Sequence, residues 1–279
     1  MINEKIESYR AKIADIYSLP EAKSILIKTA LHYSGLSFTD ILSGKRIDDE
    51  AEKKIVNALE KVLLKHPVQY VLGVTEFYGR EFFVNENVLI PRCETEELVD
   101  LVIKENQHNS VKILDIGTGS GCIAVSLSCE LPDAKVYAID ISVEALKVAA
   151  KNCNHNEAEV LFAEYDILGH SKFPYDAKFD IIVSNPPYVR MSEKKYMHDN
   201  VLEHEPHIAL FVEDSSPLIY YEACLNLAKH YLSDKGKIYV EINEFLGDNT
   251  VILFHKYGFD ASLIKDLSGK DRIIKAIKS

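Results

Sequence analysis

Several features that assign a protein to a special class are scarce in this sequence. Its 279 residues contain no apolar run long enough to span a bilayer, which argues against a membrane protein. The first residues lack a basic segment followed by an apolar one, so no secretory signal peptide is expected. The five cysteines form no Cys-x-x-Cys pair. An odd, scattered set of this kind predicts reduced thiols in a cytoplasmic protein.

Positive charge is also in short supply. Lysine and arginine number 32 against 43 aspartates and glutamates, which gives a net charge of −11. This balance argues against broad binding to a nucleic-acid backbone, although it is compatible with a local basic patch. Histidines 198, 204 and 207 cluster, but their spacing fits no standard metal-binding helix, so no metal site is expected. The remaining composition is that of an ordinary globular protein with room for two domains.

Residues 1–70 show the periodicity of helices. Apolar residues recur at three- and four-residue intervals from Ile6, and Ser18 begins a capping box before a second helix. A fourth helix is expected over residues 48–65. No nucleophile or metal-ligand cluster occurs here. We interpret residues 1–70 as a helical substrate-docking domain, because enzymes often delegate the choice of partner to such an appendage. A purely structural helical cap is the alternative.

The pattern changes after this region. Residues 71–92 are predicted to form a linker, with a β-hairpin around Gly79. In residues 93–279 helices alternate with strands, which is typical of a doubly wound α/β sheet. The strands are expected at residues 111–116, 135–139, 159–163, 179–184, 237–242, 259–264 and 272–277.

A glycine-rich turn follows the first of these strands. Glycines let a backbone approach a ligand closely, and the following helix N-terminus offers N–H donors. The Gly-x-Gly-x-Gly spacing differs from the Gly-x-Gly-x-x-Gly of dinucleotide-binding proteins, which leaves NAD binding as the weaker alternative. The turn resembles the first motif of Rossmann-like methyltransferases that use S-adenosyl-L-methionine. That resemblance implies a cofactor-binding segment composed of Asp115, Gly117, Thr118, Gly119, Ser120 and Gly121.

Acidic residues end the next two strands. A carboxylate at Asp140 can accept hydrogen bonds from both hydroxyls of a ribose. Asp166 is placed to accept from an adenine amino group, with Ile167 packing on the ring. Either aspartate alone is equally compatible with a helix N-cap or a solvated turn. Together with the glycine turn, they predict a cofactor that contains a nucleoside.

The sequence Asn185-Pro186-Pro187-Tyr188 follows the fourth strand. Proline has a fixed φ and no N–H, so this turn is rigid and leaves the carbonyls of Asn185 and Pro186 as acceptors. Two fixed acceptors suit a planar –NH2 group, and Tyr188 offers a ring face beside them. Taken alone, the motif is also compatible with a simple proline-stopped turn. It resembles methyltransferases that act on adenine, guanine or glutamine nitrogen.

Further motifs, at residues 66–73, 77–79, 88–92, 94–96, 205–211 and 266–272, are specific to one of these classes. They resemble the peptide-chain release factor N5-glutamine methyltransferases over nearly the whole chain. The resemblance implies a seven-stranded class I methyltransferase domain, a small helical N-terminal domain and a β-hairpin linker. It also implies methylation of the glutamine in the Gly-Gly-Gln motif of class-1 release factors, with S-adenosyl-L-homocysteine as product.

The resemblance assigns roles to single residues. It implies that Asn185 contacts both cofactor and substrate amide, with Pro186, Pro187 and Tyr188 completing the glutamine pocket. Arg92 and Thr95 are expected to shape the wall of the pocket, and Glu205 and His207 to lie near the substrate. Cys93 stands where the family usually has proline, a departure expected to have a small effect. The catalytic residues are therefore predicted to be Asn185, Pro186 and Tyr188.

The expected protein is a cytoplasmic monomer with release factors as partners and no nucleic-acid or membrane partner. A nucleic-acid base methyltransferase that uses the same turn is one alternative. A non-catalytic interaction protein with a vestigial cofactor fold is another. Intact glycines at 117, 119 and 121, with Asp140 and Asn185, argue against the last.

Overall fold

The computed structural model describes residues 4–107 and 110–278 of the chain. These residues fall into two compact units, and each unit is described by itself. The first comprises Met1–Val74 and His198–His204, and the second comprises Thr75–Met197 and Glu205–Ser279. Among the described residues, no helix combines the length and the apolar character that crossing a bilayer requires.

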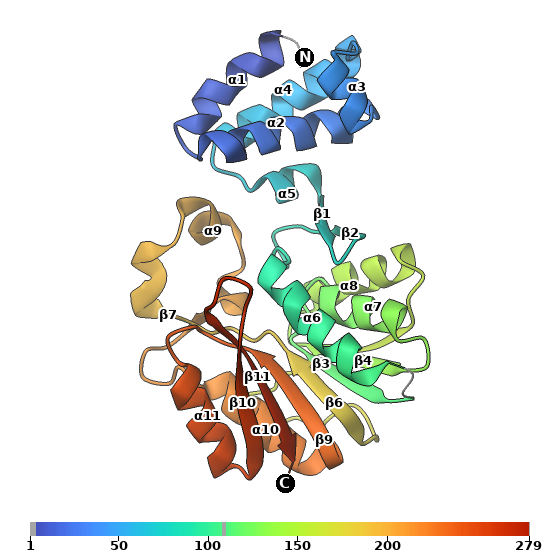
Figure 1. Ribbon diagram of the computed structural model, residues 1–279, viewed down its shortest axis with the longest axis vertical. Coiled ribbons are helices and arrows are strands. Elements are labelled where there is room, and N and C mark those ends of the chain that lie inside the picture. The colour runs from blue at the N-terminus through green and yellow to red at the C-terminus, as the bar shows by residue number, and fades with distance from the viewer. Residues whose placement is uncertain (1–3, 108–109, 279) are drawn as a thin grey trace. The chain divides into compact units, whose positions relative to one another are not determined.

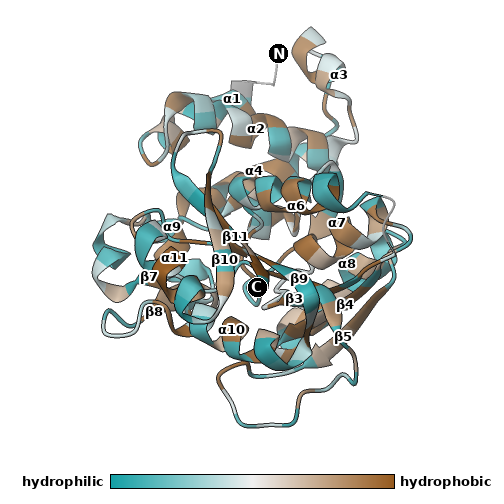
Figure 2. Ribbon diagram, turned by 60° about the horizontal axis from the view of Figure 1, so that its bottom comes forward, coloured by the Kyte–Doolittle hydropathy of each residue, from teal (hydrophilic) through white to brown (hydrophobic). Residues whose placement is uncertain are grey.

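The first unit is helical, as the periodicity predicts. The side chain of Ser18 accepts a hydrogen bond from the Glu21 N–H, and Gly35 in the left-handed conformation ends the same helix. Helix α5 is not indicated by the sequence pattern. The core consists of apolar side chains such as Ile13, Leu26 and Leu59. The helices are α1 (Glu4–Ala14), α2 (Leu19–Ser34), α3 (Phe38–Ser43), α4 (Asp49–Leu63) and α5 (Val68–Leu72). The ribbon of α2 alternates between hydrophobic and hydrophilic segments, as expected for a helix with one apolar face (Figure 2).

A distant segment completes this unit. Helix α9 (Asp199–His204) pairs with the residues that follow α4. Lys65 Nζ lies 2.5 Å from Asp199 Oδ2, and the rings of His66 and His204 stack with centroids 4.2 Å apart. Histidines 198 and 204 therefore belong to the helical unit.

The second unit is built on a seven-stranded sheet (Figure 1). The strand order is β10-β11-β9-β6-β3-β4-β5; β10 and β11 are antiparallel to their neighbours, and the other pairs are parallel. This confirms the predicted doubly wound sheet. The strands are β3 (Lys112–Ile116), β4 (Lys135–Asp140), β5 (Val160–Glu164), β6 (Phe179–Ser184), β9 (Leu232–Glu241), β10 (Phe259–Lys265) and β11 (Asp271–Lys278).

Helices cover both faces of this sheet (Figure 1). Ile113 and Ile181 pack with α6 and α7 on one face, whereas their neighbours Leu114 and Ile182 pack with α10 and α11 on the other. This alternation follows from the two-residue period of a strand. The helices are α6 (Cys93–Asn106), α7 (Cys122–Glu130), α8 (Val143–His155), α10 (Ile219–Tyr231) and α11 (Gly247–Lys256).

A β-hairpin precedes the sheet in sequence, as predicted. Strands β1 (Val74–Phe77) and β2 (Arg80–Phe83) are joined through Tyr78 and Gly79, which both have positive φ. Phe77 and Phe82 pack in the core on the α6 side of the sheet. The Asn152 side chain of α8 accepts from the backbone N–H of Phe83 and donates to its C=O, so the hairpin is fixed to the sheet domain of the second unit.

The order of the strands sets where a ligand is expected. Strand β3 lies between β4 and β6, so the chain runs outward through β4 and β5 and then returns to β6. In open α/β sheets ligands bind outside the carboxyl ends of the strands at such a switch point. Short elements follow β6 in the chain: β7 (Val189–Arg190), η1 (Met191–Tyr196), η2 (His207–Ala209) and β8 (Phe211–Val212), of which β7 and β8 pair in parallel.

Candidate active site

One pocket at the carboxyl ends of β3, β4 and β6 gathers most of the predicted site residues, all from the second unit. The structure brings together the glycine turn, both strand-end aspartates and the Asn-Pro-Pro turn. The predicted residues on its wall are Arg92, Thr95, Gly117, Thr118, Gly119, Ser120, Asp140, Asp166, Ile167, Asn185, Pro186 and Pro187. Asp115, Gly121 and Tyr188 lie behind this wall rather than on it.

The conformation of the glycine turn depends on positive φ values and on backbone hydrogen bonds. Gly117 and Gly119 have φ values of 72° and 53°, and a side chain at either position would extend into open space. The N–H groups of Gly117 and Thr118 donate to the Ile139 carbonyl at 2.9 and 3.0 Å. Because this conformation strains any residue with a Cβ, glycine is required to bring the backbone to the pocket surface.

Gly121 has a different task. Its φ is 81°, and an added Cβ would lie 3.1 Å from Ala149 Cβ on α8. This glycine therefore allows α7 to begin close against α8. The sequence motif does not distinguish it from the two glycines on the pocket wall.

Asp115 is a buried carboxylate at the end of β3. Its side chain is inaccessible to solvent, and Oδ2 accepts a hydrogen bond from Thr118 Oγ1 at 2.6 Å. The other oxygen, Oδ1, has no hydrogen-bond partner among the described residues. Burial raises the pKa of Asp115 to about 7, against the stabilising hydrogen bond from Thr118. An orphaned acidic oxygen behind a glycine turn fits a cofactor that carries an ammonium group.

Asp140 lies on the wall and is held by backbone donors. Its Oδ2 accepts from the Gly119 N–H at 2.8 Å and its Oδ1 from the Ser142 N–H at 2.9 Å. Ser142, not Asp140, caps helix α8. Burial raises the pKa of Asp140. The structure thus disfavours the helix-cap interpretation and leaves the outer lone pairs of Asp140 facing a pocket where they suit ribose hydroxyls.

A further part of the pocket wall is suited to a flat ring. Asp166 lines it and folds back on itself, with Oδ1 accepting from the Leu168 N–H at 2.9 Å. Ile167 is accompanied there by Tyr165 and Tyr220. Neither tyrosine is marked by a sequence motif. The charged and apolar groups of this pocket fit the ammonium, ribose and adenine parts of S-adenosyl-L-methionine.

The Asn-Pro-Pro-Tyr turn is anchored by a buried carboxylate that sequence reasoning missed. Asn185 Nδ2 donates to Thr95 Oγ1 at 3.0 Å, and Thr95 Oγ1 donates to Glu241 Oε2 at 2.7 Å. The Tyr188 hydroxyl donates to Glu241 Oε1 at 2.9 Å. Glu241 ends strand β9, so an acidic residue at the end of an apolar strand, the signal that marks Asp140, was available for it too.

Tyr188 consequently differs from its expected role as a ring face in the pocket. Burial raises its pKa well above the ordinary tyrosine value, and the neighbouring Glu241 acts in the same direction. A hydroxyl that stays protonated and donates to Glu241 is a structural anchor of the turn. Asn243 Nδ2 adds a second anchor by donating to the Tyr188 carbonyl at 3.1 Å.

Glu205 holds the rim of the pocket. Its side chain is buried, and its two oxygens accept from Arg92 Nη2 at 2.6 Å and from the Ile90 N–H at 3.2 Å. The structure thus turns Glu205 toward Arg92 instead of toward a substrate. His207 is exposed, and its ring meets Phe211 edge-on. Cys93 lies off the pocket wall and donates to Glu94 Oε2 at 3.1 Å, which raises the pKa of its thiol.

This chain is similar to known proteins that are named methyltransferases. The family model "Methyltransferase small domain" matches residues 95–207. A protein of Flavobacterium psychrophilum named release factor glutamine methyltransferase is 54% identical over 225 residues, 77% of this chain and 78% of that one. Its namesake in Bacteroides thetaiotaomicron is 43% identical over 276 residues, 98% of this chain and 99% of that one. The solved structure of a Pyrococcus furiosus methyltransferase is similar in fold, with a TM-score of 0.54 at 17% identity, covering 83% of this chain and 100% of that one.

Proposed function

Because this chain belongs to the release factor glutamine methyltransferase family, we propose that it methylates the side-chain amide nitrogen of a release-factor glutamine. The proposed acceptor is the glutamine of the Gly-Gly-Gln motif in class-1 release factors. The observation that carries the proposal is the position of Asn185 and Pro186 on the wall of the pocket that suits the cofactor. The product would take part in translation termination.

S-adenosyl-L-methionine supplies a methyl group on a sulfonium centre when it is bound. The protein's own task is to hold it. We assign the methionine end to the turn from Gly117 to Gly121, with Asp115 providing negative charge behind that turn. Asp140 would bind the ribose hydroxyls, and Asp166 and Ile167 would border the adenine. The orphaned Oδ1 of Asp115 supports this assignment, since a buried acidic oxygen without a partner is costly unless a cation approaches.

Orientation is the main chemical problem for this reaction. The lone pair of an amide nitrogen is delocalised, so the nitrogen is a poor nucleophile. We propose that Asn185 Oδ1 and the Pro186 carbonyl accept the two N–H bonds of the substrate amide, and that Pro187 completes the wall. These acceptors would align the nitrogen for in-line transfer and stabilise the positive charge that develops on it. The proton would leave late, through the same acceptors or to water.

The two units suggest a division of labour. We propose that residues 1–70 dock the release factor and that residues 93–279 carry out the methyl transfer. Residues 71–92 would link these two parts. The pocket is lined entirely by residues of the second unit, so no second copy of the chain is needed to complete it, which supports a monomer. The net charge of −11 supports a protein partner over a nucleic acid, and release factors place the reaction in the cytoplasm.

Transfer of label from methyl-labelled S-adenosyl-L-methionine to purified release factors tests this function. The matched control is the same release factor with the loop glutamine changed to alanine. We expect label on the unchanged factor alone, mapped by mass spectrometry to that glutamine. Label on both factors, or on DNA or ribosomal RNA included as alternative acceptors at moderate salt, would contradict the proposed substrate.

A further inference from the structure

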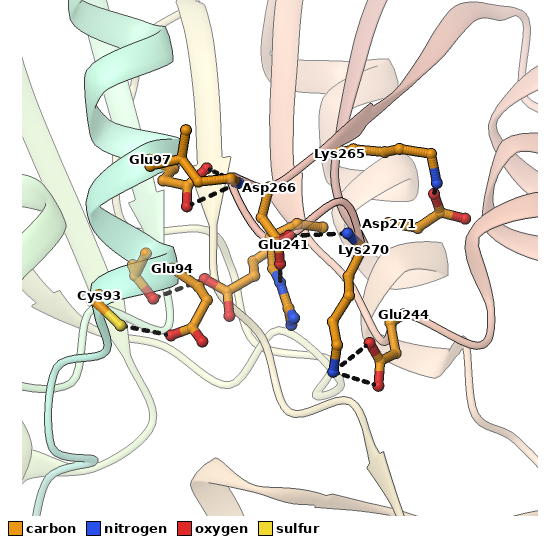
Figure 3. A network of polar contacts seen from close by, with 12 residues as sticks. Cys93, Glu94, Glu97, Glu241, Glu244, Lys265, Asp266, Lys270 and Asp271 are labelled. Atoms are coloured by element: carbon orange, nitrogen blue, oxygen red, sulfur yellow. Dashed lines mark hydrogen bonds and ion pairs between the residues drawn. The ribbon is translucent and has the colours of Figure 1, made fainter.

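Glu241 is the acidic centre of a network behind the substrate-facing turn. It is 1% exposed and lies in a charged cluster with the first turn of α6 and the β10–β11 turn (Figure 3). Its side chain accepts from Thr95 and Tyr188, at 2.7 and 2.9 Å. Glu241 does not line the pocket, so it acts on a bound molecule only through other residues.

The direction of these hydrogen bonds carries information. An ionised carboxylate can only accept hydrogen bonds, so the single hydroxyl proton of Thr95 is donated to Glu241. The Thr95 oxygen can then act only as an acceptor toward its other neighbour, Asn185. The partner atom of Asn185, 3.0 Å away, must therefore be the donating Nδ2. Because the two ends of the amide are fixed with respect to one another, Oδ1 is turned away from Thr95.

We propose that Glu241 is a positioning residue that fixes the side-chain amide of Asn185 through Thr95, so that the site presents an acceptor to an N–H donor. The inference rests on the proposed function, and it adds a selection rule. With this polarity the pocket favours a group that brings N–H bonds, such as a carboxamide. A carboxylate has only acceptor oxygens, so it could form no hydrogen bond with Asn185 Oδ1 and would be repelled by it.

Two hydroxyl groups donate to the two oxygens of Glu241, which is the arrangement that an acceptor-only, ionised carboxylate requires. Burial raises the pKa of Glu241, and the neighbouring Glu94 acts in the same direction, whereas the hydroxyls of Thr95 and Tyr188 and the positive charge of Arg272 offset this in part. The test is therefore run at pH 8, where the ionised form is favoured. Arg272 is itself held by a hydrogen bond from its Nε to Asp266 Oδ2 at 3.1 Å. The ionisable side chains around Glu241 are Glu94, Cys122, Tyr188, Tyr221 and Arg272.

Substitutions can separate the effect of hydrogen-bond direction at Thr95 from the effect of side-chain packing. In Glu241→Gln the side chain keeps its size, but it can donate as well as accept, so Thr95 is no longer forced to donate to it. Thr95 is then free to donate to Asn185 Oδ1, which permits the opposite orientation of the amide. Thr95→Val removes the relay at nearly constant volume, whereas Thr95→Ser keeps the hydroxyl. Glu105→Gln is the matched control, because Glu105 accepts from the Tyr239 hydroxyl as Glu241 does from that of Tyr188, and from Lys275 Nζ, but lies off the pocket.

A double-mutant cycle measured at pH 8 tests the relay. We expect Glu241→Gln and Thr95→Val each to lower kcat about 10- to 100-fold, with cofactor Kd changed less than about threefold. Thr95→Ser should restore most of the rate. The double variant should be no slower than the slower single variant, because both remove the same constraint. Rate losses that multiply in the double variant, or equal losses of kcat and cofactor affinity, would overturn the relay.

A readout that needs no release factor keeps this test separate from the proposed function. In ¹⁵N-labelled protein, the Asn185 carboxamide signals can be assigned by their loss in Asn185→Asp. We expect one sharp pair in the wild type and in Glu105→Gln, and shifted or broadened signals in Glu241→Gln. Unchanged signals in Glu241→Gln would overturn the positioning role. A wild type that shows the sharp pair but does not methylate release factor would overturn the proposed function alone.

Discussion

Arg92 Nη2 lies 2.6 Å from Oε1 of Glu205 and joins two chain segments that are 113 residues apart. The glutamate side chain is almost fully buried, whereas the arginine side chain is 33% exposed. Both segments contribute to the pocket wall, the first through Arg92 and the second through Pro206 and Ile208. This ion pair therefore couples the stability of the fold to the shape of the site.

Glu205→Gln is expected to lower both the stability of the fold and the affinity of the pocket for the cofactor. The arginine loses its buried counter-charge, so the free energy of unfolding should fall by about 1–3 kcal/mol, and cofactor Kd should rise several-fold. Thermal unfolding and calorimetric titration measure the two effects. Glu130→Gln is the control, because the Arg80–Glu130 pair is of similar length at 2.7 Å but lies partly exposed and off the pocket. An equal loss of affinity in both variants would contradict the rim role.

Asn185→Ala should separate turnover from cofactor binding. It removes one acceptor that is needed only when the amide nitrogen reacts, so kcat is expected to fall about 100- to 1,000-fold. Cofactor Kd should change less than about threefold. Single-turnover kinetics with a release factor and titration with S-adenosyl-L-homocysteine provide the two numbers. Parallel losses in both would mean that Asn185 serves mainly the cofactor.

Asp115 predicts an unusual dependence of stability on pH. Its pKa is raised from 3.8 to about 7 by burial, so the native state holds a proton that the unfolded state has already released. Stability from this group is therefore present below pH 4 and is lost as pH rises from about 4 to 7. The loss amounts to at most ~4 kcal/mol.

Asp115→Asn should remove that slope. We expect the difference in Tm between variant and wild type, measured without cofactor, to move in favour of the variant from pH 5 to pH 8. With cofactor, the wild type should release protons on binding near pH 7, because a cation near Oδ1 favours the ionised form. Calorimetry in two buffers of different ionisation enthalpy detects this release. A constant Tm difference across the range would show that Asp115 does not titrate there.

Gly121→Ala tests whether this glycine serves packing. Its φ of 81° and a Cβ contact of 3.1 Å to Ala149 should together cost about 2–4 kcal/mol of stability. Gly258→Ala is the control, because φ is 83° there but no atom lies within 4 Å of the added Cβ. It should cost only the backbone strain of about 1–2 kcal/mol. Denaturant unfolding compares the two, and equal losses would exclude a packing role.

Local patterns made much of this molecule predictable. The apolar runs around Ile113 and Ile181, separated by helical segments, predict the sheet, and the polar residues that follow such runs place Asp140 and Asn185 at one edge of it. Those inferences need only the pattern of a buried strand and the rule for switch points. The predicted strand over 237–242 is longer in the structure, Leu232–Glu241, because its exposed start carries charged residues that hide the pattern.

Tertiary contacts explain what the patterns did not show. Tyr188 has the same sequence signal whether its ring faces a ligand or its hydroxyl faces Glu241, and only the position of β9 decides. The partner of Glu205 is set by the fold of residues 90–92, which lie 113 residues away. Helix α9 follows the substrate-facing turn in sequence, yet it packs with the N-terminal helices through contacts that no periodicity encodes.

Because α9 belongs to the helical unit, that unit is built from two separate segments of the chain. The chain crosses between the units after Val74, again after Met197, and a third time before Glu205. A module joined by one crossing can be lost or exchanged by a single recombination event, whereas this one is joined at three junctions. Removal of residues 1–70 alone would leave Asp199 and His204 without Lys65 and His66. Any transplant of this unit between relatives must therefore carry residues 198–204 with it.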